Sequence, residues 1–73
     1  MSSQTQSVLF DLRDGWTAPT AEAWLAAHDM YPMKRVHKTK NKLRYRLRDP
    51  HQFERFRTVD IDDVGIQFVV GWL

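Results

Sequence analysis

Lysine and arginine, the residues that bind anions, dominate one segment of the sequence. Residues 34–48 contain eight of them in fifteen positions. In the second half of the segment they occupy every other position: Lys40, Lys42, Arg44, Arg46 and Arg48. Side chains two apart in a strand point to the same face of a sheet, so this spacing predicts a row of five cations. We call these five residues the cationic stripe.

The residues between these cations are apolar. Leu43, Tyr45 and Leu47 would point to the opposite face of the same strand. The pattern therefore predicts a strand with one core face and one cationic face, whereas a helix would spread the charges around its circumference. Exposed cationic rows are typical of proteins that bind polyanions. We expect the cationic stripe to bind the partner, together with the neighbouring Lys38 and Arg35.

Alternatives to this reading remain open. Lysine and arginine on an edge strand also protect a sheet against edge-to-edge aggregation. The net charge is −3 over residues 1–30, +8 over 31–57 and −3 over 58–73, so acids from either end could lie beside the central cations. An acidic protein surface and nucleic acid are both candidate partners. Because Tyr45 points to the core side, the stripe lacks the aromatic platform typical of single-strand binding.

No constellation typical of an enzyme is found in the sequence. The three glycines are isolated, so they form no phosphate-binding loop. The three histidines are scattered and cysteine is absent, so we expect neither a metal site nor a disulfide. The serines occur only at positions 2, 3 and 7, where we expect no rigid base to activate them. We expect a protein that is not an enzyme and uses no cofactor.

The elements that must position the stripe follow from turn and helix signals. We expect a disordered tail at 1–6, because it is small and polar, and a single compact domain at 7–73. Thr17 and Pro19 mark the start of a helix at about 18–29, which is too short to stand alone and must cover a sheet. A helical turn is expected at 51–56. Strands are predicted at 7–13, 33–39, 41–48, 56–61 and 65–73.

This order predicts an α+β fold, with a small antiparallel sheet of three to five strands and one main α-helix packed on one face. Asp60, Asp62 and Asp63 are expected to form a solvent-exposed acidic loop whose negative charge compensates that of the cationic segment. No apolar window approaches 18 residues, and the first residues lack the pattern of a secretory signal. We therefore expect no membrane association and a cytoplasmic location.

A set of core and turn positions carries a resemblance to a known family. These positions are Trp16-Thr17, Ala21, Ala23-Trp24-Leu25, His28, Leu43, Tyr45-Arg46, Arg48-Asp49-Pro50, Phe53, Phe56-Arg57-Thr58, Gly65-Ile66 and Val69-Val70-Gly71. Over about residues 7–71 the chain resembles a small domain recurrent in tailed-phage proteins, which occurs alone or attached to head-assembly and prohead-protease proteins. As a free-standing chain it is similar to the small transcription regulators of lytic Xanthomonas phages.

The resemblance to these regulators implies a function by binding. The expected partner is the host RNA polymerase, near the amino-terminal end of its β′ subunit. Binding would inhibit initiation by displacing the σ factor and would cause antitermination during elongation. The chain would act as a monomer in the host cytoplasm, with nucleic acid nearby on the polymerase. The shared positions are core and turn positions, so no binding residue carries over. Two alternatives are a structural or assembly role in the phage head and a nucleic-acid-binding module that uses the stripe.

Overall fold

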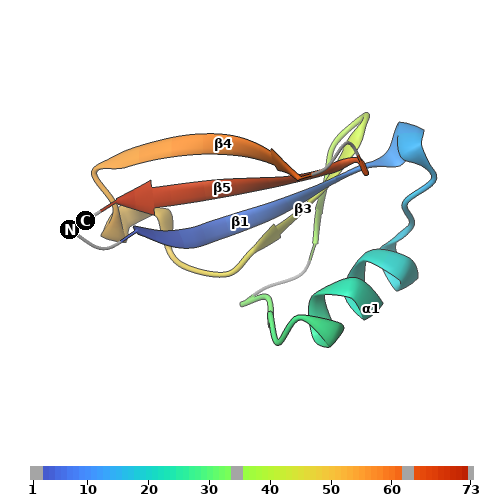
Figure 1. The fold of residues 1–73 in the computed structure, drawn as a ribbon, viewed down its shortest axis with the longest axis horizontal. Helices are drawn as coiled ribbons and strands as arrows, with labels where there is room; N and C mark the ends of the chain where they lie inside the picture. The colour runs from blue at the N-terminus through green and yellow to red at the C-terminus, as the bar shows by residue number, and fades with distance from the viewer. Residues whose placement is uncertain (1–2, 34–35, 62–63, 73) are drawn as a thin grey trace.

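The fold consists of one α-helix and an antiparallel sheet, as seen in a computed structural model that describes residues 3–33, 36–61 and 64–72 (Figure 1). Within these residues the elements are β1 (Ser3–Asp11), α1 (Ala18–Ala27), β2 (His37–Lys38), β3 (Lys42–Arg46), β4 (Arg55–Ile61) and β5 (Ile66–Trp72). The strand order is β2-β3-β1-β5-β4, and every neighbouring pair is antiparallel. The predicted α+β class is confirmed, and β1 lies at the centre of the sheet.

Strand β1 begins earlier than the sequence predicts. Residues 3–6 belong to it, so the expected tail at 1–6 is wrong for these four residues, while residues 1–2 lie outside the described chain. The cause is a buried amide. The fully buried side chain of Gln6 donates to the carbonyl of Arg48 at 2.8 Å and accepts from the hydroxyl of Ser7 at 2.6 Å. A polar segment can occupy the centre of a sheet when its side chains are hydrogen-bonded in this way.

Helix α1 begins where its capping residues place it. Thr17 accepts a hydrogen bond from the Thr20 backbone N–H, and the Thr20 hydroxyl accepts one from the Thr17 N–H, which forms a capping box. Pro19 lies in the first turn, where it has no hydrogen bond to lose. The helix ends at Ala27, slightly before the expected boundary, and Asp29 follows with a left-handed backbone (φ 57°). The helix prediction is confirmed apart from its last residues.

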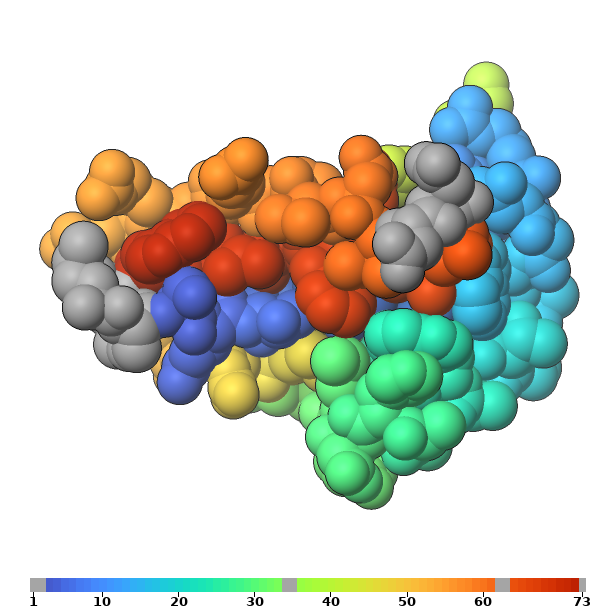
Figure 2. Space-filling view, viewed as in Figure 1, coloured from blue at the N-terminus to red at the C-terminus, as the bar shows by residue number. Residues whose placement is uncertain are grey.

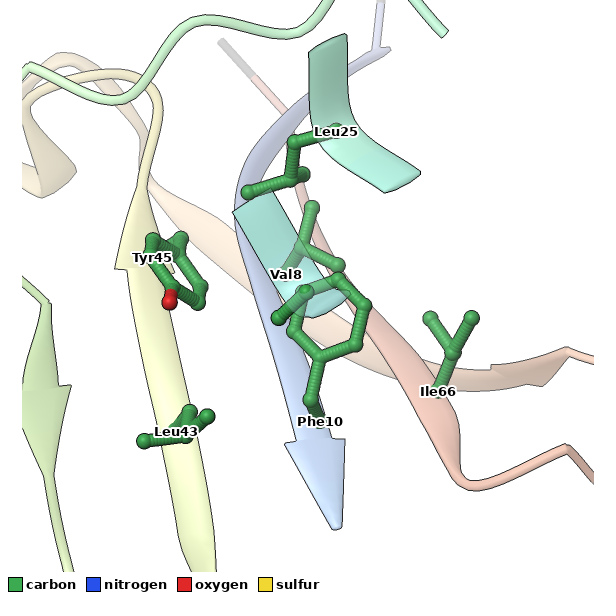
Figure 3. Packing of buried hydrophobic residues seen from close by; sticks show 7 residues of the cluster. Val8, Phe10, Leu25, Leu43, Tyr45 and Ile66 are labelled. Atoms are coloured by element: carbon green, nitrogen blue, oxygen red, sulfur yellow. The ribbon is translucent and has the colours of Figure 1, made fainter. Parts of the chain in front are cut away.

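The core lies between α1 and one face of the sheet. Its buried side chains come from the helix and the three central strands (Figure 3): Val8, Phe10, Ala21, Leu25, Leu43, Tyr45 and Ile66. The ring of Phe10 is at the middle of this cluster, 4.9 Å from the Trp16 ring and 5.6 Å from the Tyr45 ring between centroids. The burial of this cluster away from water fixes which face of β1 and β3 points inward.

The opposite face of the sheet, which we call the open face, is uncovered by any helix among the described residues. Aromatic side chains cover part of it. The predicted helical turn at 51–56 is a 3-10 turn at Pro50–Gln52, which is followed by the buried Phe53. The ring of Phe53 lies against Gly71 of β5, where an added Cβ would be only 2.5 Å from the ring. Phe53 therefore covers the β4–β5 side of the open face and leaves β3 free.

Candidate functional site

Strand β3 has the two faces that its alternation predicts. Leu43 and Tyr45 are each only 2% exposed and lie in the core beneath α1. Lys42, Arg44 and Arg46 alternate with them and so point to the open face, where each side chain is half-buried. The core contacts of the two apolar residues therefore hold these three cations on one side of the sheet.

The cationic stripe is shorter as a strand feature than the sequence predicts. Lys40 lies in the turn of the β2–β3 hairpin, which is closed by a 2.8 Å hydrogen bond from the Thr39 N–H to the Lys42 carbonyl. Arg48 lies in a bend after the end of β3. Both residues are exposed. Strand alternation does not reach either of them, so the stripe comprises three cations on β3 and one exposed cation beyond each end.

Of the two flanking cations that sequence reasoning added, Lys38 is described, and it does not share the face of the stripe. Lys38 is the antiparallel partner of Leu43, and residues directly opposite each other share a face. The backbone of Lys38 therefore directs its side chain to the same side as α1, away from Lys42 and Arg44. Arg35 lies outside the described residues. The expected strand at 33–39 is described only as the short strand His37–Lys38.

Uncharged oxygens hold two of the three β3 cations on the open face. The Arg44 guanidinium donates to Oε1 of Gln6 at 3.3 Å and to the hydroxyl of Ser7 at 3.4 Å. The Lys42 ammonium donates to Oε1 of Gln67 on β5. Among the described residues, none of the β3 cations forms an ion pair with a carboxylate. These contacts restrict the cationic side chains without neutralising their charge.

Two acids lie near the cations but interact first with other groups. Asp11 is level with Lys42 in the sheet, yet both its oxygens accept hydrogen bonds from Arg13, at 2.9 and 3.1 Å. These side-chain bonds, together with the Arg13 backbone N–H, lower the pKa of Asp11 to about 2. Asp60 accepts from Nε2 of Gln67 at 2.8 Å. The predicted acidic loop is described only at Asp60, which belongs to β4, because residues 62–63 lie outside the described chain.

Three residues that hold this face were missed by sequence reasoning. Gln6 and Ser7 are fully buried at the centre of the sheet, and Gln67 links Lys42 to Asp60. These neutral polar residues form no periodic pattern in the sequence from which their role could be predicted. The only available hint was that Gln67 interrupts an otherwise apolar run in the last strand.

The described residues show neither a group of acidic or histidine side chains that could hold a metal ion, nor a helix long and apolar enough to cross a membrane. The arrangement on the open face instead offers positive charge held on one side of the sheet. Such a surface can attract and orient a negatively charged partner. Comparison of the chain with protein-family models, curated proteins and solved structures finds no match.

Proposed function

We propose that this protein is a phage-encoded regulator that binds the host RNA polymerase through its open face. It inhibits initiation by displacing the σ factor and acts as an antiterminator during elongation, and it does so by occupying a surface, without making or breaking bonds. The single observation that carries the binding role is the row of cations on β3, two of which, Lys42 and Arg44, are held by neutral oxygens. The identity of the partner rests on the resemblance of the chain to the small regulators of Xanthomonas phages.

The geometry of the cations favours a protein surface as the partner. Arg44 and Lys42 already have restricted side chains in the free protein. Ordering a long cationic side chain on binding costs roughly 0.5–1.5 kcal/mol, and this cost is reduced when the side chain is already held. A rigid cationic surface also speeds encounter with an acidic partner and fixes its orientation. The open face is therefore suited to docking on an acidic segment such as one of the β′ subunit.

The distribution of aromatic rings argues against free nucleic acid as the ligand of the open face. Tyr45 lies in the core on the other side of β3. The open-face rings Phe53 and Phe56 pack on each other beside Gly71, and the strand order separates β4 from β3 by two strands. Bases of a single strand stack on aromatic rings that lie among cations. The β3 cations have no such ring next to them among the described residues.

The proposal is tested by mixing the labelled protein with purified host core polymerase at micromolar concentration and separating the species by gel filtration. We expect the label to elute with the polymerase, and added σ factor to reduce the amount bound, because the two compete. A variant with Lys40→Ala and Arg48→Ala, which removes only exposed charges, should bind less. Elution of the wild-type label only at the position of the free protein would contradict the proposal. Recovery of the chain from purified virions would then favour the head-assembly alternative.

A further inference from the structure

A second group of cations lies on β4, apart from the cationic stripe. Arg55 and Arg57 are two residues apart on this edge strand, so their side chains share a face. The antiparallel register places Arg55 directly opposite Trp72 of β5 and Arg57 opposite Val70. Residues opposite each other share a face, so an indole ring and two guanidinium groups occur together. We call Arg55, Arg57 and Trp72 the Arg–Trp patch.

The Arg–Trp patch is on the helix side of the sheet but beyond the helix. Trp72 is four positions from Phe68 in the same strand, so their side chains share a face, and Phe68 contacts the ring of Trp24 on α1. The last residues of β5 extend away from this contact (Figure 1). Figure 2 shows the end of β5, in dark red, open to solvent beside the orange side chains of β4 and well separated from α1. This end of the sheet face is therefore accessible to a ligand.

The surface at this end is hollowed. A depression of about 410 Å³ is lined by the three residues of the patch and by Phe56. Both arginines are exposed and Trp72 is half-buried. Among the described residues neither arginine forms an ion pair with a carboxylate. Two exposed guanidinium groups on β4 thus lie on one side of an indole ring, next to a single hollow.

This combination matches the chemistry of single-stranded nucleic acid. An indole ring can stack on the face of an unpaired base, and the guanidinium groups beside it on β4 can bind the adjoining phosphates. A duplex hides the faces of its bases, and an acidic peptide offers carboxylates but no planar ring for the indole. We propose that the Arg–Trp patch is a binding site for single-stranded nucleic acid, distinct from the open face.

The site is tested by fluorescence anisotropy with a labelled oligothymidylate at low salt, using the complete chain. We expect saturable binding that is stronger than binding to a duplex of the same length. Trp72→Leu should weaken it by roughly 5- to 150-fold, the effect of losing one stacked base, and Trp72→Phe should restore most of it. The double variant Arg55→Ala/Arg57→Ala should reduce the log–log salt slope by about 1.4, since each single-strand phosphate contact contributes about 0.7.

The matched control is Lys40→Ala/Arg48→Ala, which removes the same net charge from the cationic stripe. It should leave oligothymidylate binding nearly unchanged, and circular dichroism should show that every variant is folded. Equal weakening by both double variants would mean general electrostatic attraction and would overturn the site. Absence of binding by the wild type, or equally effective competition by polyglutamate, would overturn it as well. Because this assay contains no polymerase, its outcome is independent of the proposed polymerase-binding role.

Discussion

The side chain of Gln6 offers a direct test of how the central strand is held. It is fully buried, its amide donates to the Arg48 carbonyl at 2.8 Å, and its oxygen accepts the hydroxyl hydrogen of the buried Ser7 at 2.6 Å. In Gln6→Leu the Ser7 hydroxyl loses its acceptor without access to water. A buried polar group left unpaired costs about 1–3 kcal/mol. At about 4–8 °C per kcal/mol for a domain of this size, the Tm should fall by roughly 4–24 °C.

The measurement is thermal unfolding followed by circular dichroism, with urea unfolding as a second probe. Gln4→Leu is the matched control, because Gln4 is exposed in the same strand and should change the stability by less than about 0.5 kcal/mol. The double variant Gln6→Leu/Ser7→Ala should recover part of the loss, since removing both partners leaves no unpaired hydroxyl. A Gln6→Leu protein as stable as Gln4→Leu would refute the role of the Gln6 hydrogen bonds. It would favour instead the frayed tail that the composition of this segment predicts.

Further predictions concern packing and pH. Gly71→Ala should destabilise the fold by about 1–3 kcal/mol in urea unfolding, because the new methyl group would clash with the Phe53 ring. Adding Phe53→Leu to this variant should relieve part of that cost. Additive effects of the two substitutions on the free energy of unfolding would contradict the contact. Burial, helped by a neighbouring carboxylate of α1, raises the pKa of Tyr45 from 10.0 to about 12. The free energy of unfolding should therefore fall as pH rises from about 10 to 12, and Tyr45→Phe should not show this fall. The same pH dependence in the wild type and Tyr45→Phe would exclude Tyr45 as its cause. The pKa of Asp11 is lowered to about 2, so its stabilising effect is present above about pH 4 and is lost as pH falls towards 2. Acid unfolding of Arg13→Ala should therefore begin at a higher pH than that of the wild type. Coincident acid-unfolding curves of the two proteins would rule out this role of Arg13.

The sequence predicted the elements whose signals are local. The alternation of Leu43 and Tyr45 with cations identified the two faces of β3, and Thr17 with Pro19 located the start of α1. These signals work because strand geometry and helix capping depend on residues that are close in the chain. The α+β class followed from the same patterns, since a single short helix must cover a sheet to bury its apolar side.

The candidate site was predicted less fully, because its geometry depends on contacts between distant segments. The neutral oxygens that hold Arg44 come from Gln6 and Ser7, which are 38 and 37 positions away in the chain, respectively. The polar composition of residues 1–6 suggested that Gln6 belonged to a disordered tail. Its hydrogen bonds inside the sheet leave no periodic pattern in the sequence, so nothing there contradicted that interpretation. Trp72 likewise joins Arg55 only through the pairing of β4 with β5. Pairing register between strands is a tertiary property that one alternating pattern cannot specify.

The central claim, that the cationic stripe binds the host polymerase, is tested most directly by charge reversal of the two exposed residues at its ends. Fluorescence anisotropy would measure the affinity of labelled protein for core polymerase over a range of salt concentrations. Lys40→Glu/Arg48→Glu should weaken binding by roughly ten-fold or more and flatten its salt dependence, whereas Arg55→Glu/Arg57→Glu, with the same net charge, should bind like the wild type. Equal affinities for the wild type and the Lys40→Glu/Arg48→Glu variant would contradict the claim.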